Sequence, residues 1–207
     1  EEEEEGEGED EVVGSPSRKR LRVHKSPHLI RSLYLVLDLS SSLTPPSLSS
    51  SPSASPSPHF KPSHLSCLLT TCTDFITEYF DLNPVSTLGI VAMRSLGASC
   101  ITDGLHPSGR QDFLKKRLAG VLTQPGATRG EMSLWKGLEV AGRSLAQTPG
   151  FSTREVLLLT TSLRSTDPGD IYSTLLPVVK GEGVRVGAVT MSGCEVFLVR
   201  RVVEICG

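Results

Sequence analysis

Residues 32–42 read SLYLVLDLSSS, and this stretch decides the fold. From Leu33 to Asp38 the chain is apolar without alternation, which is typical of a strand covered on both faces of a sheet. The run ends in one carboxylate, and the hydroxyls of Ser40 and Ser42 follow it. The spacing Asp38-x-Ser40-x-Ser42 supplies the first oxygen groups of a site for a hard cation. The remaining loops must then show whether such a site is complete.

The rest of the chain alternates apolar strands with amphipathic helices. Further strands are expected at residues 88–93, 98–102, 155–160 and 184–190. Helices are expected at residues 65–80, 111–122, 133–147, 170–180 and 195–206. This order predicts an α/β fold with an open, mostly parallel sheet and helices on both faces. Ligands of such sheets bind beyond the carboxyl ends of the strands, so Asp38 and the loop at residues 160–170 should share one edge.

Charge and composition divide the chain into a lead-in and a domain. Residues 1–11 contain nine acidic residues and no basic one, and 14 acidic and 21 basic residues remain after them. We expect residues 1–28 to be a disordered acidic, then basic, lead-in and residues 29–207 to be the domain. Within the domain, residues 43–62 are rich in Ser and Pro and are expected to form a disordered insertion.

The basic cluster at residues 17–25, SRKRLRVHK, has three readings. It fits a nuclear-import signal, a nucleic-acid patch or a solvated lead-in to the domain. The acidic run beside it would mask these charges, so no direct nucleic-acid binding is expected.

Several functional classes lack support in the sequence. The five cysteines form no C-x-x-C pair, and no glycine-rich phosphate-binding motif follows a strand. The five histidines lie in the lead-in or in loops, away from any nucleophile motif. No apolar stretch approaches the roughly 18 residues that cross a bilayer, and the acidic start is unlike a secretory leader. We therefore expect an intracellular protein without enzymatic activity and without a membrane partner.

Longer stretches carry a family resemblance. FITEYFDLNPVSTLGIV (residues 75–91), GEMSL (130–134), PGFSTREVLLL (149–159) and SLRSTDPGDIY (162–172) occur in this order after the D-x-S-x-S motif. The chain resembles the von Willebrand factor A domain of the Ssl1-like core subunit of general transcription factor IIH, the partner of the XPD helicase.

The resemblance implies a nuclear, non-catalytic subunit. Its A domain would bind and stimulate the XPD-type helicase, beside other factor IIH core subunits, in transcription initiation and nucleotide excision repair. The zinc of the family belongs to carboxyl-terminal modules, and neither these modules nor the last strand of the domain is found in this sequence. We therefore expect a fragment or a truncated gene model.

The resemblance also identifies what a metal site would need. A-domain sites combine D-x-S-x-S with a threonine from a second loop and an aspartate after a later core strand. The second-loop position is Met132 or Ser133, and Thr161 stands where the aspartate is expected. One carboxylate is too little for tight binding of a divalent cation, so no metal or other cofactor is firmly predicted. Asp38 is instead expected to accept N–H bonds from the turning loop. A metal-dependent ligand-binding domain of the adhesion type remains the alternative, with Mg²⁺ as its ion.

The loop TSLRSTDPGD (residues 161–170) is the predicted binding segment. Pro168 and Gly169 favour a turn, and Asp170 is placed to cap the next helix. A braced loop loses little entropy on binding, and the guanidinium of Arg164 can pair with a partner carboxylate. Partner contacts are predicted at Arg164, Ser165, Thr166 and Asp167.

Overall fold

A computed structural model describes residues 30–40, 64–94, 97–122, 131–162, 165–167, 170–190 and 196–207. The predicted lead-in at residues 1–28 and the predicted insertion at 43–62 lie outside these ranges. Ser42 and Arg164, which the sequence marks as candidate site residues, also lie outside them.

The described strands form one sheet. They are β1 (Arg31–Asp38), β2 (Thr87–Arg94), β3 (Gly97–Cys100), β4 (His106–Pro107), β5 (Thr153–Thr160) and β6 (Val184–Thr190). The strand order is β3-β2-β1-β5-β6, and β4 pairs with β2. The pairs β1–β2, β1–β5 and β5–β6 are parallel, whereas β3 and β4 run antiparallel to β2. The predicted mostly parallel sheet is confirmed.

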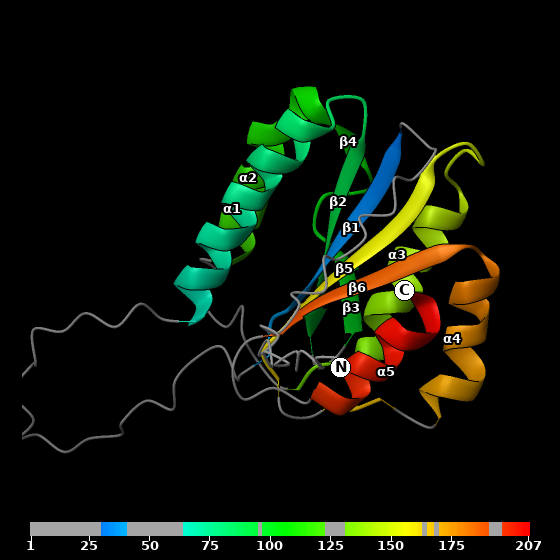
Figure 1. Ribbon diagram of the computed structural model, residues 1–207. Coiled ribbons are helices and arrows are strands. Elements are labelled where there is room, and N and C mark those ends of the chain that lie inside the picture. The colour runs from blue at the N-terminus through cyan, green and yellow to red at the C-terminus, as the bar shows by residue number, and fades with distance from the viewer. Residues whose placement is uncertain are drawn as a thin grey trace, which may run out of the picture.

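Helices cover both faces of this sheet. They are α1 (His64–Leu82), the 3-10 helix η2 (Ser108–Arg110), α2 (Gln111–Leu122), α3 (Leu134–Ala146), α4 (Ile171–Gly181) and α5 (Val196–Cys206). Helices α1 and α2 lie on one side of the sheet, and α3, α4 and α5 lie on the other (Figure 1).

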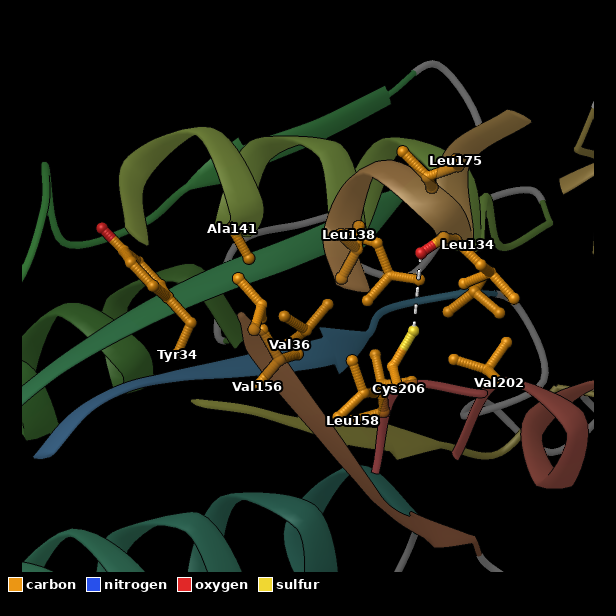
Figure 2. Packing of buried hydrophobic residues seen from close by; sticks show 14 of the residues in the cluster. Tyr34, Val36, Leu134, Leu138, Ala141, Val156, Leu158, Leu175, Val202 and Cys206 are labelled. Carbon is orange, nitrogen blue, oxygen red and sulfur yellow. Dashed lines mark hydrogen bonds between the residues drawn. The ribbon is translucent and has the colours of Figure 1, made fainter. Parts of the chain in front are cut away.

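The central strand β1 supplies side chains to two separate cores because alternate residues of a strand point to opposite faces. Tyr34 and Val36 belong to the core beneath α3, α4 and α5. Figure 2 shows this core, with Cys206 donating its S–H to the carbonyl of Leu176. Leu33, Leu35 and Leu37 belong to the core beneath α1 and α2.

Two glycines allow unusually close packing against the sheet. A Cβ on Gly137 of α3 would lie 2.5 Å from Sδ of Met93, so α3 sits almost directly on β2 at this point. A Cβ on Gly89 of β2 would lie 2.4 Å from the ring of Tyr34. These distances are far below van der Waals contact, so both positions require glycine in this packing.

The predicted element boundaries differ from the structure at a few places. Strand β5 begins two residues earlier than expected because the N–H of Thr153 donates to the carbonyl of Ile30 at 3.0 Å. The edge strand β3 ends at Cys100 rather than at residue 102, since the hydroxyl of Thr102 accepts the N–H of Ile90 in place of a strand partner. The two-residue strand β4 was not expected, because so short a segment has no pattern of its own.

Candidate functional site

Asp38 lies at the carboxyl edge of the sheet, where β1 and β5 end side by side, and its side chain is fully buried. Its Oδ1 accepts the N–H of Ser40 at 2.9 Å. Its Oδ2 accepts the N–H groups of Thr161 and Ser162 at 2.9 and 2.8 Å and the hydroxyl of Ser162 at 2.6 Å. The hydroxyls of Thr160 and Thr161 approach the same oxygen at 3.2 and 3.3 Å. The buried carboxylate therefore ties the end of β1 to the loop that follows β5.

Two further side chains close this cluster. The hydroxyl of Ser40 is hydrogen-bonded to the hydroxyl of Ser162. The hydroxyl of Thr160 also donates to Sδ of Met132 at 3.3 Å, and Met132 is itself buried. The thioether of Met132, which precedes α3, thus packs beside the carboxylate of Asp38.

The residues at this edge do not fit a hard divalent cation. Such an ion takes about six oxygen ligands, whereas both oxygens of Asp38 are already used by N–H and O–H donors. Backbone N–H groups cannot coordinate a cation, and sulfur is a soft ligand that Mg²⁺ does not favour. Across the described ranges, no three His, Cys, Asp or Glu side chains are grouped as metal ligands would be. Ser42, the third residue of the motif, lies outside those ranges.

Ser133, the other candidate ligand, caps a helix. Its backbone is extended, and its hydroxyl oxygen accepts the N–H of Lys136 at the start of α3. The same hydroxyl donates to Oδ1 of Asp167 at 2.7 Å. Ser133 is therefore committed to the amino terminus of α3.

Asp167 serves as a second cap for α3, although it comes from a distant loop. Its carboxylate accepts the N–H of Leu134 at 3.0 Å and the N–H of Trp135 at 2.9 Å. It also accepts the hydroxyl of Ser165. A negative charge at the first turn of a helix is stabilised by the exposed N–H groups and the helix dipole.

The segment at residues 165–167 is also paired with Met132. Ser165 and Met132 form an isolated parallel bridge, and the N–H of Thr166 donates to the carbonyl of Met132 at 2.8 Å. The hydroxyl of Thr166 donates to the same carbonyl at 3.1 Å, and the hydroxyl oxygen of Ser165, whose proton goes to Asp167, lies 3.4 Å from it. Both hydroxyls therefore take part in internal hydrogen bonds, and partner contact at Ser165 and Thr166 stays a prediction.

The structure tests one part of the predicted bracing of this loop. Asp170 caps α4 as expected, since its carboxylate accepts the N–H of Tyr172 at 3.0 Å. The hydroxyl of Ser173 and this N–H hold the pKa of Asp170 below its usual value. Pro168 and Gly169 lie outside the described residues, and the bracing that can be seen comes from Met132 and α3. The sequence correctly predicts that the loop after β5 lies at the same edge as Asp38, but it does not predict the attachment of Asp167 to α3.

Two side chains of the described ranges that could carry chemistry, Cys72 and His106, are engaged in packing or internal contacts. Burial raises the pKa of the Cys72 thiol to about 12, so this thiol is neutral at physiological pH. Of the five histidines, His106 is described with a ring contact to the carbonyl of Thr102 and an edge contact to Phe113. The helices that the structure describes include none with the length and apolar character of a membrane span.

Comparisons with known proteins give a consistent picture. The profile described as Ssl1-like matches residues 48–206. General transcription factor IIH subunit 2 of Arabidopsis thaliana is 31% identical over 179 residues, which cover 86% of this chain and 38% of that protein. General transcription and DNA repair factor IIH subunit ssl1 of Schizosaccharomyces pombe is 32% identical over 198 residues, covering 94% of this chain and 41% of that protein. The chain thus spans about two fifths of the length of these relatives.

Solved structures agree on the fold. The SpRpn10 VWA domain aligns with a TM-score of 0.58 and 12% identity over 86% of this chain and 82% of that one. Proximal thread matrix protein 1 from the mussel byssus, in a structure with a zinc-occupied MIDAS motif, aligns with a TM-score of 0.59 and 18% identity over 85% of this chain and 41% of that one. At these identities the likeness shows a von Willebrand A-type fold and carries no functional statement.

Proposed function

Because this chain belongs to the Ssl1-like family, we propose that it is a non-catalytic core subunit of the general transcription and DNA repair factor IIH. The proposal places it in the nucleus, among the other subunits of that factor. The names of the matched relatives support this role, since each is described as a subunit of the factor.

We further propose that the carboxyl edge of the sheet binds an XPD-type helicase and raises its ATPase and helicase activity. The observation that carries this proposal is the double attachment of residues 165–167, to the carbonyl of Met132 and to the first turn of α3. A segment fixed in this way loses little conformational entropy when a partner docks on it. Thr166 is exposed while its backbone is held, and Arg164, two residues earlier in the sequence, carries a guanidinium that suits a partner carboxylate.

The proposal requires no metal. The buried carboxylate of Asp38 holds the start of the loop after β5 through direct hydrogen bonds from the N–H groups of Thr161 and Ser162. Docking should therefore proceed equally well in the presence of a chelator, unlike ligand binding by an adhesion-type A domain. Binding to the helicase with and without EDTA separates these two functions.

The test of helicase binding uses the purified chain and the XPD-type helicase of the same organism. We expect a complex by calorimetry and a several-fold rise in ATP turnover. Arg164→Glu should weaken the complex while the circular-dichroism spectrum stays unchanged. Lys116→Glu is the matched control, because it makes the same change of charge at an exposed position on α2. The proposal fails if the parent chain gives neither a complex nor a change in turnover, or if both variants weaken binding equally.

A further inference from the structure

A concave site lies at the opposite end of the sheet from Asp38. The turns that precede β5 and β6 enclose a pocket of about 220 Å³, with Arg154 and Arg185 among its lining residues. Each arginine is the second residue of its strand, whereas Asp38 is the last residue of β1, and β1, β5 and β6 are parallel neighbours (Figure 1). The pocket therefore belongs to the amino edge of the sheet, remote from the proposed helicase-binding edge.

Arg154 is held in place by the protein itself. Its Nε and Nη2 donate to the hydroxyl and the carbonyl of Thr148 at 3.3 and 3.0 Å, and its Nη1 donates to the carbonyl of Glu182 at 2.9 Å. These acceptors are neutral, so they do not balance the positive charge, and a guanidinium has further N–H donors beyond them. A guanidinium fixed before binding loses less rotamer entropy on meeting an anion than a mobile one does.

Arg185 adds a second positive charge at the pocket. It is exposed on β6 and lies opposite Glu155 in the strand register. The carboxylate of Glu155 is already bound by the guanidinium of Arg31 and by the hydroxyl of Thr153. Neither Arg185 nor Arg154 takes part in the ion pairs formed among the described residues. Both charges thus remain for a ligand.

The acidic side chain of the pocket lining is that of Glu182. Its carboxylate lies toward α3, where Oε2 is 3.8 Å from a Cβ placed on Gly142. The lining therefore combines two basic side chains with one acidic side chain. This excess of positive charge favours a ligand that carries a single negative charge, because the carboxylate of Glu182 repels a dianion more strongly than a monoanion.

Exposed apolar side chains stand on the same edge. Phe151 lies between the lining residues Gly150 and Ser152 in the chain and is 62% exposed. Val85, which is 54% exposed, precedes β2 by two residues, just as Phe151 precedes β5. Only β1 separates these two strands in the sheet, so their starts are about 10 Å apart. Apolar groups beside a charged pocket suit a protein segment better than a small inorganic anion.

We propose that the amino edge of the sheet binds an extended acidic segment of another protein. An Asp or Glu side chain of that segment enters the pocket and pairs with Arg154 and Arg185, and a neighbouring large apolar side chain packs on Phe151. Charge complementarity selects the acid, and the exposed ring selects its apolar neighbour. A phosphorylated segment is the competing ligand, which the charge of Glu182 disfavours.

The experiment measures the binding of fluorescein-labelled peptides to the full chain by fluorescence anisotropy. The probe is the peptide Gly-Asp-Glu-Leu-Phe-Gly, and a reference peptide carries Asn and Gln in place of its two acids. We expect saturable binding of the probe and binding of the reference that is about tenfold weaker. Binding of the probe should weaken several-fold between 0.05 and 0.5 M NaCl because salt screens the exposed charges.

Variants of the chain locate the site. Arg185→Glu should weaken binding of the probe about tenfold, Arg185→Gln should give a smaller loss, and Phe151→Ser should weaken binding several-fold. Lys116→Glu makes the same change of charge at an exposed position on α2, and Phe197→Ser removes a phenyl ring that is 74% exposed on α5. Both controls should bind the probe like the parent chain, and all variants should keep the parent's circular-dichroism spectrum.

Three results would overturn the proposal. The first is a lack of saturable binding of the probe to the parent chain. The second is an equal loss of binding in the pocket variants and in the two controls, which would indicate adsorption without a defined site. The third is tighter binding of a peptide with phosphoserine in place of the two acids, which would assign the pocket to phosphorylated segments. None of these results bears on helicase binding, since that proposal concerns the other edge of the sheet.

Discussion

Replacing Asp38 by Asn tests the role assigned to the buried carboxylate. The amide has the same shape, but it carries one acceptor oxygen and one NH₂ donor where Asp38 has two acceptors. If the amide oxygen replaces Oδ2, the NH₂ group meets the N–H of Ser40, and this buried donor loses its acceptor. If the amide is turned over, the NH₂ group meets the N–H groups of Thr161 and Ser162 instead. Either orientation leaves at least one buried N–H group unsatisfied.

The magnitude follows from these bonds. An unsatisfied buried donor costs about 1–3 kcal/mol, and the retained bonds weaken because a charged acceptor is roughly twice as strong as a neutral one. Part of this loss is offset because a buried charge has been removed. We expect Asp38→Asn to lower the free energy of unfolding by about 2–4 kcal/mol, a large share of the 5–15 kcal/mol typical of a domain.

Urea unfolding followed by circular dichroism measures this change. Asp74→Asn, at an exposed position on α1, is the matched control and should stay within about 0.5 kcal/mol of the parent. A second arm adds 10 mM Mg²⁺ to the parent chain. An ion bound with a dissociation constant of about 0.1 mM would stabilise the fold by about 2.7 kcal/mol, whereas we expect no shift. The reasoning is refuted if Asp38→Asn matches the control, or if Mg²⁺ stabilises the parent and not the variant.

Three further predictions use the same unfolding assay. Gly137→Ala should cost about 1–3 kcal/mol because its Cβ has no room against β2, whereas Gly120→Ala, with open space around it in α2, should gain about 0.5–1 kcal/mol; equal effects would contradict the close packing. Asp167→Asn should cost about 1–3 kcal/mol by weakening the cap on α3 and should also reduce helicase affinity in calorimetry; unchanged stability would mean that the cap is dispensable. Burial raises the pKa of both Tyr34 and Tyr79 from 10.0 to about 12, and the unfolded chain ionises first, so stability should hold below pH 10 and fall between pH 10 and 12. Tyr79→Phe should reduce this fall, and a flat profile up to pH 12 in the parent would refute the assignment.

The fold could be predicted largely from local patterns. The continuous apolar run of β1 and the helical stripe of α1 each follow from one periodicity, so both elements were found within two residues of their ends. The short strand β4 has no such pattern, because it consists of His106 and Pro107 and pairs only at the margin of β2. Boundaries set by contacts with distant residues were also missed, as at Thr153, where the partner is the carbonyl of Ile30.

The site was predictable where neighbours in sequence determine it. The spacing of Asp38 and Ser40 predicts a local bond from side chain to backbone, and the structure contains it. The capping role of Asp170 follows equally from its place before a helix. The bonds from Asp167 to α3 could not be foreseen, because they join residues more than thirty positions apart and depend on how the loop turns. The direction of the Met132 side chain toward the carboxylate cluster likewise follows from packing and not from any motif.

The contact between Tyr34 and Gly89 has an evolutionary consequence. The phenol ring and the carbonyl oxygen of Gly104 occupy the volume that any side chain at position 89 would need, so position 89 cannot change by itself without a steric clash. Descendants of this sequence should therefore keep glycine at position 89 unless the ring at position 34 and the backbone at Gly104 both change with it. A lineage that kept the tyrosine beside an alanine would have to displace the phenol ring, and the disturbance would reach the core beneath α3 to which that ring belongs.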